Sequence, residues 1–188
     1  MIRKLEEVIV LKNRFFKVFN DRVVFDEKNE GTHLKIEQTN KQNGIAILPI
    51  LENGNVLLIK NYRYSINKEI YQVVKGGNGT IFENQDIALQ CAKEELEEEA
   101  GLVSKDIRFL QTFYESPSIL NIKGYSFLAL NCKEPKIRKR YKEETESISG
   151  YVEVKLEDLE DFLLNNEMCS TSMFLIQKYI NLKLKELI

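Results

Sequence analysis

Residues 88–102 contain the feature that most constrains how this chain can fold, a run of strong helix formers that is also dense in carboxylates. The run reads A-L-Q-C-A-K-E-E-L-E-E-E-A-G-L. Alanine, leucine, lysine, glutamine and glutamate all favour the helical conformation. Gly101 stands where a glycine commonly terminates a helix. The sequence therefore predicts a helix that ends at Gly101.

The acids of this helix fall on the same side as its apolar residues. With Glu95 at the origin of a wheel of about 100° per residue, Glu99 lies at about 40° and Glu98 at about 300°. The sector from about 320° to about 60° also contains the apolar residues of the preceding turns, which are Ala88, Cys91 and Ala92. Three carboxylates are therefore expected to point toward the protein body, whereas Glu97, at about 200°, points away.

Three carboxylates in this position are unfavourable on their own. Like charges one turn apart repel by roughly a few tenths of a kcal/mol, and the helix C-terminus adds about 0.3–1 kcal/mol for each acid. Partial burial increases the cost further. A hard divalent cation removes the conflict, because Mg²⁺ prefers oxygen ligands and keeps waters that a phosphate can displace. The alternative is a solvated acidic face, which is common on glutamate-rich helices.

Composition bounds the class of protein. The chain has 188 residues, of which 43% are hydrophobic and 30% charged, with a formal net charge of −2. This fits one domain, or one domain with a small N-terminal addition. The interspersed charge provides no basic footprint for nucleic acid, and no apolar run approaches the ~20 residues that span a membrane. The first ten residues contain acids where a signal peptide would be apolar, so we expect a cytoplasmic protein.

The cysteines and the single histidine form no recognisable motif. Cys91, Cys132 and Cys169 are odd in number and lack C-x-x-C spacing, which argues against a zinc site and a disulfide framework. Such a pattern suits a reducing compartment. His33 lies in a polar stretch, so we interpret it as a surface residue rather than as half of a Ser-His or Cys-His pair.

Short β segments precede residue 40. Two apolar runs flank the turn-forming dipeptide Asn20-Asp21, which indicates a hairpin. The predicted strands are residues 7–12, 15–19, 22–25 and 32–37. Four strands of this length make a poor core alone. We therefore expect them to pack on the main domain or on a second subunit.

Further strands and helices follow in a mixed order. Residues 44–51 form a largely apolar run, typical of a strand buried on both faces. Other strands are predicted at 56–60, 70–75, 107–115, 123–130 and 151–154, and amphipathic helices at 156–164 and 171–187. This order predicts an α+β fold, an α/β/α sandwich with a mixed sheet between helices. Before the acidic helix, Gly76, Gly77 and Gly79 form a loop that can cradle phosphate.

The acidic helix resembles the signature of the Nudix hydrolases, G-x5-E-x7-R-E-U-x-E-E-x-G-U, in which U is apolar. The second half of the signature matches in register at Glu95, Leu96, Glu98, Glu99, Gly101 and Leu102. In that family the acids at the positions of Glu95, Glu98 and Glu99 hold Mg²⁺ or Mn²⁺ ions.

The first half of the signature departs from the family pattern. Glu94 replaces the family arginine, which forms a salt bridge to the first glutamate of the signature. In strict register that glutamate is Asp86, and the opening glycine is Thr80. We interpret Gly76 as the opening glycine, followed by a longer loop.

Motifs along nearly the whole chain resemble the ADP-ribose pyrophosphatase branch of this family. In chain order they lie at residues 44–49, 61–63, 72–76, 114–118 and, as an acidic loop, 143–148. Position 72 is glutamine where the branch has glutamate. The resemblance implies a Nudix domain over residues 41–188 and an N-terminal β extension over residues 1–40. It also implies a homodimer whose N-terminal strands help to build the partner's substrate site.

The resemblance further implies metal-dependent hydrolysis of a nucleoside diphosphate linked to a sugar, most simply ADP-ribose, to AMP and a sugar phosphate. The metal ligands that it implies are Glu95, Glu98, Glu99 and the backbone oxygen near Gly76. Glu98, Glu144 or Glu146 would serve as the catalytic base. For the two loop acids, the alternative is that they are simply solvated.

Four residues are candidates for contact with this substrate: Arg63, Tyr62, Gly77 and Ser116. The planar guanidinium of Arg63 suits a phosphate, and the alternative is a structural salt bridge. Tyr62, like Phe16, would either stack on the base or be a buried aromatic. The competing function is a catalytically decayed Nudix fold that only binds nucleotide, which the residues Glu94 and Gln72 would explain.

Overall fold

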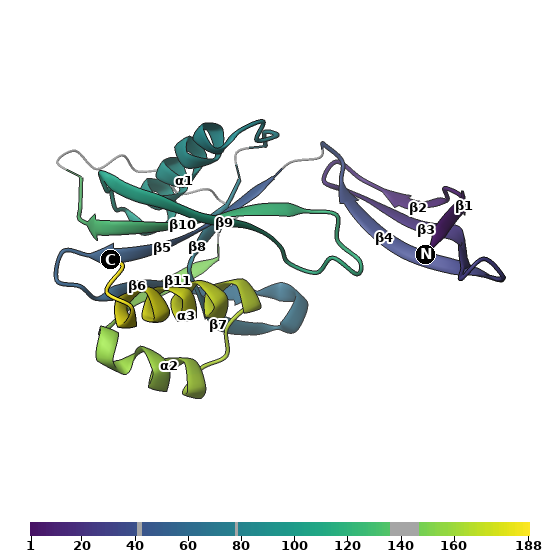
Figure 1. The fold of residues 1–188 in the computed structure, drawn as a ribbon. Helices are drawn as coiled ribbons and strands as arrows, with labels where there is room; N and C mark the ends of the chain where they lie inside the picture. Colours follow the sequence, from purple (N-terminus) through teal and green to yellow (C-terminus); the bar gives the residue numbers. More distant parts are fainter. Residues whose placement is uncertain (41–42, 78, 136–146) are drawn as a thin grey trace.

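The computed structural model describes residues 1–40, 43–77, 79–135 and 147–188. A seven-stranded mixed sheet has helices on both faces, and a separate four-stranded sheet precedes it in the chain (Figure 1). The predicted α+β fold, with a mixed sheet between helices, is confirmed. No helix in the described ranges is long and apolar enough to cross a membrane.

Five of the seven strands of the large sheet follow the order β11-β6-β5-β10-β9. These strands are β5 (Gly44–Leu51), β6 (Val56–Arg63), β9 (Asp106–Tyr114), β10 (Lys123–Cys132) and β11 (Ile148–Val154). Two shorter strands extend it, β7 (Lys68–Gln72) beside β6 and β8 (Val74–Gly76) beside β5. The β5–β10 pair is parallel, and the other pairs are antiparallel.

The central strand β5 separates two hydrophobic cores. It is buried on both faces, as its apolar sequence predicts. Ile45 and Ile47 belong to the core beneath α1 (Gln85–Ala100). Ala46 and Leu48 belong to the opposite core, beneath α2 (Leu159–Asn165) and α3 (Ser170–Leu184). Successive strand residues alternate between the two faces of a sheet. Ile45 and Ile47 therefore mark the face of the sheet that packs against α1.

Helix α1 begins and ends with the capping residues that its sequence contains. Asn84 accepts hydrogen bonds from the backbone N–H groups of Asp86 and Ile87, at 3.0 and 3.1 Å. At the other end Gly101 has φ 66°, a left-handed conformation that favours glycine. Its N–H donates to the Glu97 carbonyl at 3.0 Å. The predicted helix end is confirmed.

The strand predicted over residues 70–75 is two strands that meet at Val73. Before this residue the chain pairs with β6, and after it with β5. The Val73 N–H donates to the Ser172 hydroxyl at 3.0 Å instead of to a strand. The apolar pattern continues through the break because both halves are buried, so the pattern could not reveal the change of partner.

The N-terminal sheet consists of β1 (Arg3–Glu6), β2 (Ile9–Lys12), β3 (Phe16–Phe25) and β4 (Asn29–Gln38). The predicted hairpin at Asn20-Asp21 is wrong, because both residues lie inside β3. Every residue of β3 pairs with β4. The Asn20 N–H donates to the Val8 carbonyl at 2.8 Å, and the Asp21 carboxylate accepts from the Val8 N–H at 3.1 Å. Pairing along the whole strand therefore overrides the local turn preference.

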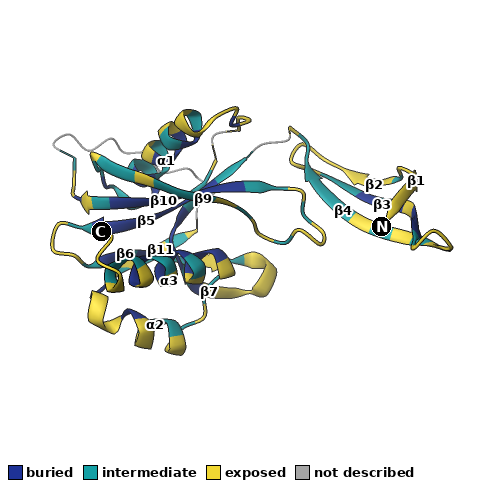
Figure 2. Cartoon of the chain, viewed as in Figure 1, coloured by how far each residue is buried: buried dark blue, intermediate teal, exposed yellow. Residues whose placement is uncertain are grey.

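Within the described residues, the segment after β9 makes hydrogen bonds that join this sheet to the rest of the molecule. The Ile36 N–H donates to the Ile119 carbonyl at 2.7 Å, and the Asn121 N–H donates to the Ile36 carbonyl at 2.9 Å. Strands β1 and β2 are exposed along their whole length, as the yellow strands of Figure 2 show. His33, interpreted as a surface residue, is half-buried on β4. The sheet thus leaves much of its surface uncovered.

Candidate active site

The acids at the C-terminal end of α1 do not form a uniformly solvated face. Glu99 is buried, with 6% of its surface exposed, and Glu95 and Glu98 are half-buried. Oε2 of Glu99 accepts a hydrogen bond from the Lys75 backbone N–H at 3.0 Å. A carboxylate that accepts from a fixed backbone N–H is held in one orientation. Strand β8 therefore positions at least one acid of the predicted site.

Gly76 of β8 provides the space that Glu95 occupies. A methyl group at Gly76 would lie 2.3 Å from Cδ and from both carboxylate oxygens of Glu95. Glycine is therefore required here by close approach and not by an unusual backbone conformation, since residue 76 is an ordinary strand residue. The sequence singled out Gly76 as the opening glycine, and the structure supplies the physical reason. The Glu95 carboxylate lies directly against the strand backbone.

The residues at this place suit a hard divalent cation in their chemistry. Glu95, Glu99 and the backbone of Gly76 offer oxygen donors, which are the ligands that Mg²⁺ and Mn²⁺ prefer. The cradle at Gly76, which any side chain would fill, is the observation that supports this fit. Within the described ranges, no three His, Cys, Asp or Glu side chains are grouped closely enough to hold a metal ion. The complete ligand set therefore stays a prediction.

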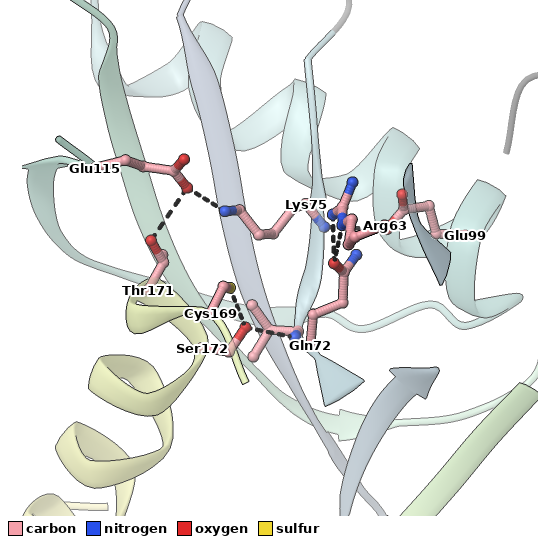
Figure 3. A network of polar contacts seen from close by, with 9 residues as sticks. Arg63, Gln72, Lys75, Glu99, Glu115, Cys169, Thr171 and Ser172 are labelled. Carbon is pink, nitrogen blue, oxygen red and sulfur yellow. Dashed lines mark hydrogen bonds and ion pairs between the residues drawn. The ribbon is translucent and has the colours of Figure 1, made fainter. Parts of the chain in front are cut away.

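Arg63 and Gln72 lie on the same face of the sheet as these acids. Residue alternation places Arg63 with Ile59, which faces α1, and Gln72 pairs directly with Ile59. The Arg63 Nε donates to Gln72 Oε1 at 3.1 Å, and its Nη2 donates to the same oxygen (Figure 3). None of the ion pairs in the described part of the chain involves Arg63. Among the described residues the hydrogen-bond partner of Arg63 is a neutral amide, and the alternative of a structural salt bridge stays untested.

A second polar cluster lies on the opposite face, and the sequence did not reveal it. The Lys75 side chain forms an ion pair with Glu115, and the Thr171 hydroxyl donates to the same carboxylate at 3.1 Å (Figure 3). Partial burial raises the pKa of Glu115, but the hydrogen bond and charge of Lys75, with Thr171 and Arg63, lower it below the usual value. This cluster connects β8, the end of β9 and α3. No local pattern joins residues so far apart in the chain.

The other residues predicted to contact the substrate differ in their exposure and in their hydrogen bonds. Tyr62 is 37% exposed, and its hydroxyl donates to Asn67 at 2.8 Å. Phe16, on the N-terminal sheet, is also 37% exposed, so the interpretation of either ring as a buried aromatic is wrong. The Ser116 carbonyl accepts from the N–H groups of Ile119 and Leu120 in the turn after β9. The predicted loop acids Glu144 and Glu146 lie outside the described residues.

Gly77 has a structural role that the sequence did not show. A methyl group on Gly77 would lie 2.9 Å from the Asn43 carbonyl oxygen. Asn43 also accepts from the Phe82 N–H at 2.7 Å through its side chain, and its own N–H donates to the Thr80 carbonyl at 3.2 Å. The loop before α1 is therefore organised around Asn43, a residue without a sequence motif.

The residues that depart from the family signature have local surroundings that the structure describes. Glu94, in place of the family arginine, accepts a hydrogen bond from Gln90 at 2.9 Å, one helical turn earlier. Asp86, which occupies the position of the first signature glutamate, is exposed in the first turn of α1. An acid there is stabilised by the helix N-terminus. It lies at the opposite end of the helix from Glu95 and Glu99.

Comparison with known proteins shows the family and the fold of the chain. Residues 40–170 match the sequence model of the NUDIX domain. ADP-ribose pyrophosphatase from Bacillus subtilis (strain 168) is 27% identical over 186 residues, covering 97% of this chain and 96% of that protein. A solved structure of an ADP compounds hydrolase has the same fold, with a TM-score of 0.76 at 21% identity. The match covers 96% of this chain and 94% of that one.

Proposed function

Because the chain belongs to the NUDIX domain family, we propose that it hydrolyses the pyrophosphate bond of a nucleoside diphosphate linked to a sugar. The proposed substrate is ADP-ribose or an ADP-sugar, and the products are AMP and a sugar phosphate. The similarity to an ADP-ribose pyrophosphatase along nearly the full length of both chains supports this substrate class. The observation that carries the proposal is the Glu95 carboxylate against Gly76, beside the buried and hydrogen-bonded Glu99.

The proposed mechanism assigns each residue a part in neutralising and orienting the diphosphate. Hydrolysis of a pyrophosphate depends on charge neutralisation, a positioned water and in-line geometry. When bound, Mg²⁺ or Mn²⁺ would activate the water and neutralise phosphate charge. Glu95 and Glu99 would hold the cation with the backbone oxygen of Gly76. Glu98 would be a further ligand or the base. The Lys75 N–H donates to Glu99 and keeps it oriented, as hydrogen bonds to ligating carboxylates do in metal sites.

The remaining predicted residues contribute to substrate binding in this proposal. Arg63, on the same face as the acids, would bind a phosphate through its outward N–H groups. Tyr62 is partly exposed and, by strand alternation, lies on the other face of β6 from Arg63, so it would contact the base only at the end of the strand. The loop at Gly77 and the turn at Ser116 would border the ligand. Glu144 or Glu146 would serve as an alternative base.

We expect the purified protein to release AMP from ADP-ribose only when Mg²⁺ or Mn²⁺ is present. Chelation should lower turnover by at least about a hundredfold, because metal ions supply several kcal/mol of the stabilisation of the transition state. A panel of nucleoside diphosphate derivatives, separated by ion-exchange chromatography, measures both the products and the preference. Binding measured by calorimetry without turnover of any substrate would instead support a nucleotide-binding protein without activity.

We further propose that residues 1–40 form a dimerisation element attached to a Nudix domain of residues 41–188. Strand β2 exposes three consecutive apolar residues, Ile9, Val10 and Leu11, each more than half exposed. Patches of exposed apolar residues mark interaction surfaces, and a four-stranded sheet with one uncovered face has too little core to be stable alone. A second copy of the chain would cover this surface.

Light scattering after size exclusion should give twice the chain mass of 22.0 kDa. Val10→Lys should shift the protein to the monomer, because a charge would be buried in the interface. Leu164→Lys is the matched control, since Leu164 is 82% exposed on α2, away from the N-terminal sheet. A monomeric wild-type protein would contradict the proposal.

A further inference from the structure

The amide of Gln72 has its orientation set by Arg63. Gln72 is fully buried, and its Oε1 accepts from both Nε and Nη2 of Arg63. A guanidinium has five N–H donors and no acceptor. The amide oxygen must therefore face Arg63, and the amide nitrogen must point the other way.

This orientation leaves a buried donor without a partner. Within the part of the chain that the structure describes, Gln72 Nε2 makes no hydrogen bond. Buried polar groups are nearly always paired, and an unpaired donor is unfavourable. The two hydrogen bonds from Arg63 therefore hold the amide in a position that its nitrogen does not favour. The arrangement satisfies donors of the Arg63 guanidinium and leaves the Gln72 amide nitrogen without a hydrogen bond among the described residues.

The partner of Arg63 is also neutral. In the described ranges no ion pair neutralises this half-buried guanidinium, although it is close enough to Glu115 to help lower the pKa of that carboxyl. A carboxylate at position 72 would have nearly the same shape as glutamine and would accept the same two hydrogen bonds. It would, however, cancel the positive charge on the face that carries Glu95 and Glu99.

We propose that Gln72 is a positioning residue that holds the Arg63 guanidinium on this face without neutralising it. The full positive charge then remains for the phosphates of the ligand. This inference rests on the proposed function, in which the ligand is a nucleoside diphosphate. At the position of Gln72 the branch that the chain resembles has glutamate. With glutamine there, the ligand meets an arginine that no ion pair in the described ranges neutralises.

Two variants of similar shape separate charge from packing. Gln72→Glu keeps the acceptor and adds a negative charge, whereas Gln72→Met removes the acceptor without adding charge. We expect Gln72→Glu to raise KM for ADP-ribose about tenfold, equivalent to the loss of one charge-assisted contact, with kcat changed less than about twofold. The dependence of KM on salt concentration should become weaker, because one charge no longer acts on the phosphates. Gln72→Met should keep the salt dependence and raise KM by only about threefold.

A double-mutant cycle tests whether the effect passes through Arg63. The dissociation constant of the non-hydrolysable α,β-methylene analogue of ADP-ribose is measured by calorimetry for wild type, Gln72→Glu, Arg63→Met and the double variant. We expect Gln72→Glu to have little further effect once Arg63 is removed, because contacting residues are strongly coupled. Equal effects of Gln72→Glu and Gln72→Met, or an undiminished effect of Gln72→Glu without Arg63, would overturn the inference.

The same measurements separate this inference from the proposed function. If the wild-type protein neither binds nor hydrolyses any nucleoside diphosphate derivative, the proposed function and the inference fail together. If the wild type binds and hydrolyses them, and Gln72→Glu has the same KM and salt dependence, only the role of Gln72 is wrong. Circular dichroism and thermal unfolding of each variant confirm that the comparison is made between folded proteins.

Discussion

Replacement of Glu99 by glutamine should reduce kcat/KM for ADP-ribose by at least about a hundredfold while the chain stays folded. Loss of a metal-binding carboxylate removes several kcal/mol of electrostatic stabilisation, and each 1.36 kcal/mol is a factor of ten in rate. The amide oxygen of glutamine can still accept the hydrogen bond from the Lys75 N–H, which Glu99 accepts at 3.0 Å. The substitution therefore removes the charge and retains the main structural contact.

Glu97→Gln is the matched control for this experiment. It makes the same chemical change two residues earlier, on the side of α1 that the helical wheel places opposite Glu95. We expect its kcat/KM to stay within about twofold of wild type, because Glu97, although half-buried, points away from Glu95 and Glu99. Steady-state kinetics of both variants with saturating Mg²⁺, together with their unfolding curves in urea, measure the two effects separately. Full activity of Glu99→Gln would contradict the assigned site.

Substitution of alanine for Gly76 should reduce activity by about a hundredfold with little loss of stability. The new methyl group would lie 2.3 Å from the carboxylate atoms of Glu95, so the carboxylate must move. It is the far end of a flexible side chain, and we expect its displacement to cost the fold about 1 kcal/mol or less. A shift of about 1 Å in a catalytic group can lower the rate about a hundredfold. Activity and stability should therefore respond very differently to this single methyl group.

Gly150→Ala provides the comparison for the methyl group itself. Gly150 also lies in a strand, β11, and a methyl group there would meet no atom within 4 Å. We expect this variant to match wild type in both kcat/KM and the free energy of unfolding. If Gly76→Ala keeps wild-type turnover, the close approach of Glu95 to β8 has no catalytic consequence, and the proposed cation site is misplaced.

The sequence alone determined the features that depend on neighbouring residues. Helix formers and the glycine at position 101 act within one or two turns, so the sequence predicted the body of helix α1 and its end. The start at Gln85, capped by Asn84, came only from the structure. The continuous apolar run of residues 44–51 predicted a strand buried on both faces, since only a central strand can bury every side chain. The placement of acids on the apolar side of α1 predicted a buried carboxylate, and Glu99 is one.

Only the tertiary structure decided the features that depend on which distant segments meet. The sheet pairing of β3 extended a strand through Asn20-Asp21, where local preferences predicted a turn. The change of partner at Val73 brought Lys75 to Glu99 and Gly76 to Glu95. The pairing of β6 with β7 brought Arg63 to Gln72. A local sequence pattern reflects the preference of each residue for a conformation or for burial. Strand register and sheet topology determine which side chains meet. The residues proposed for the site could therefore be named from the sequence, whereas the contacts between them could not.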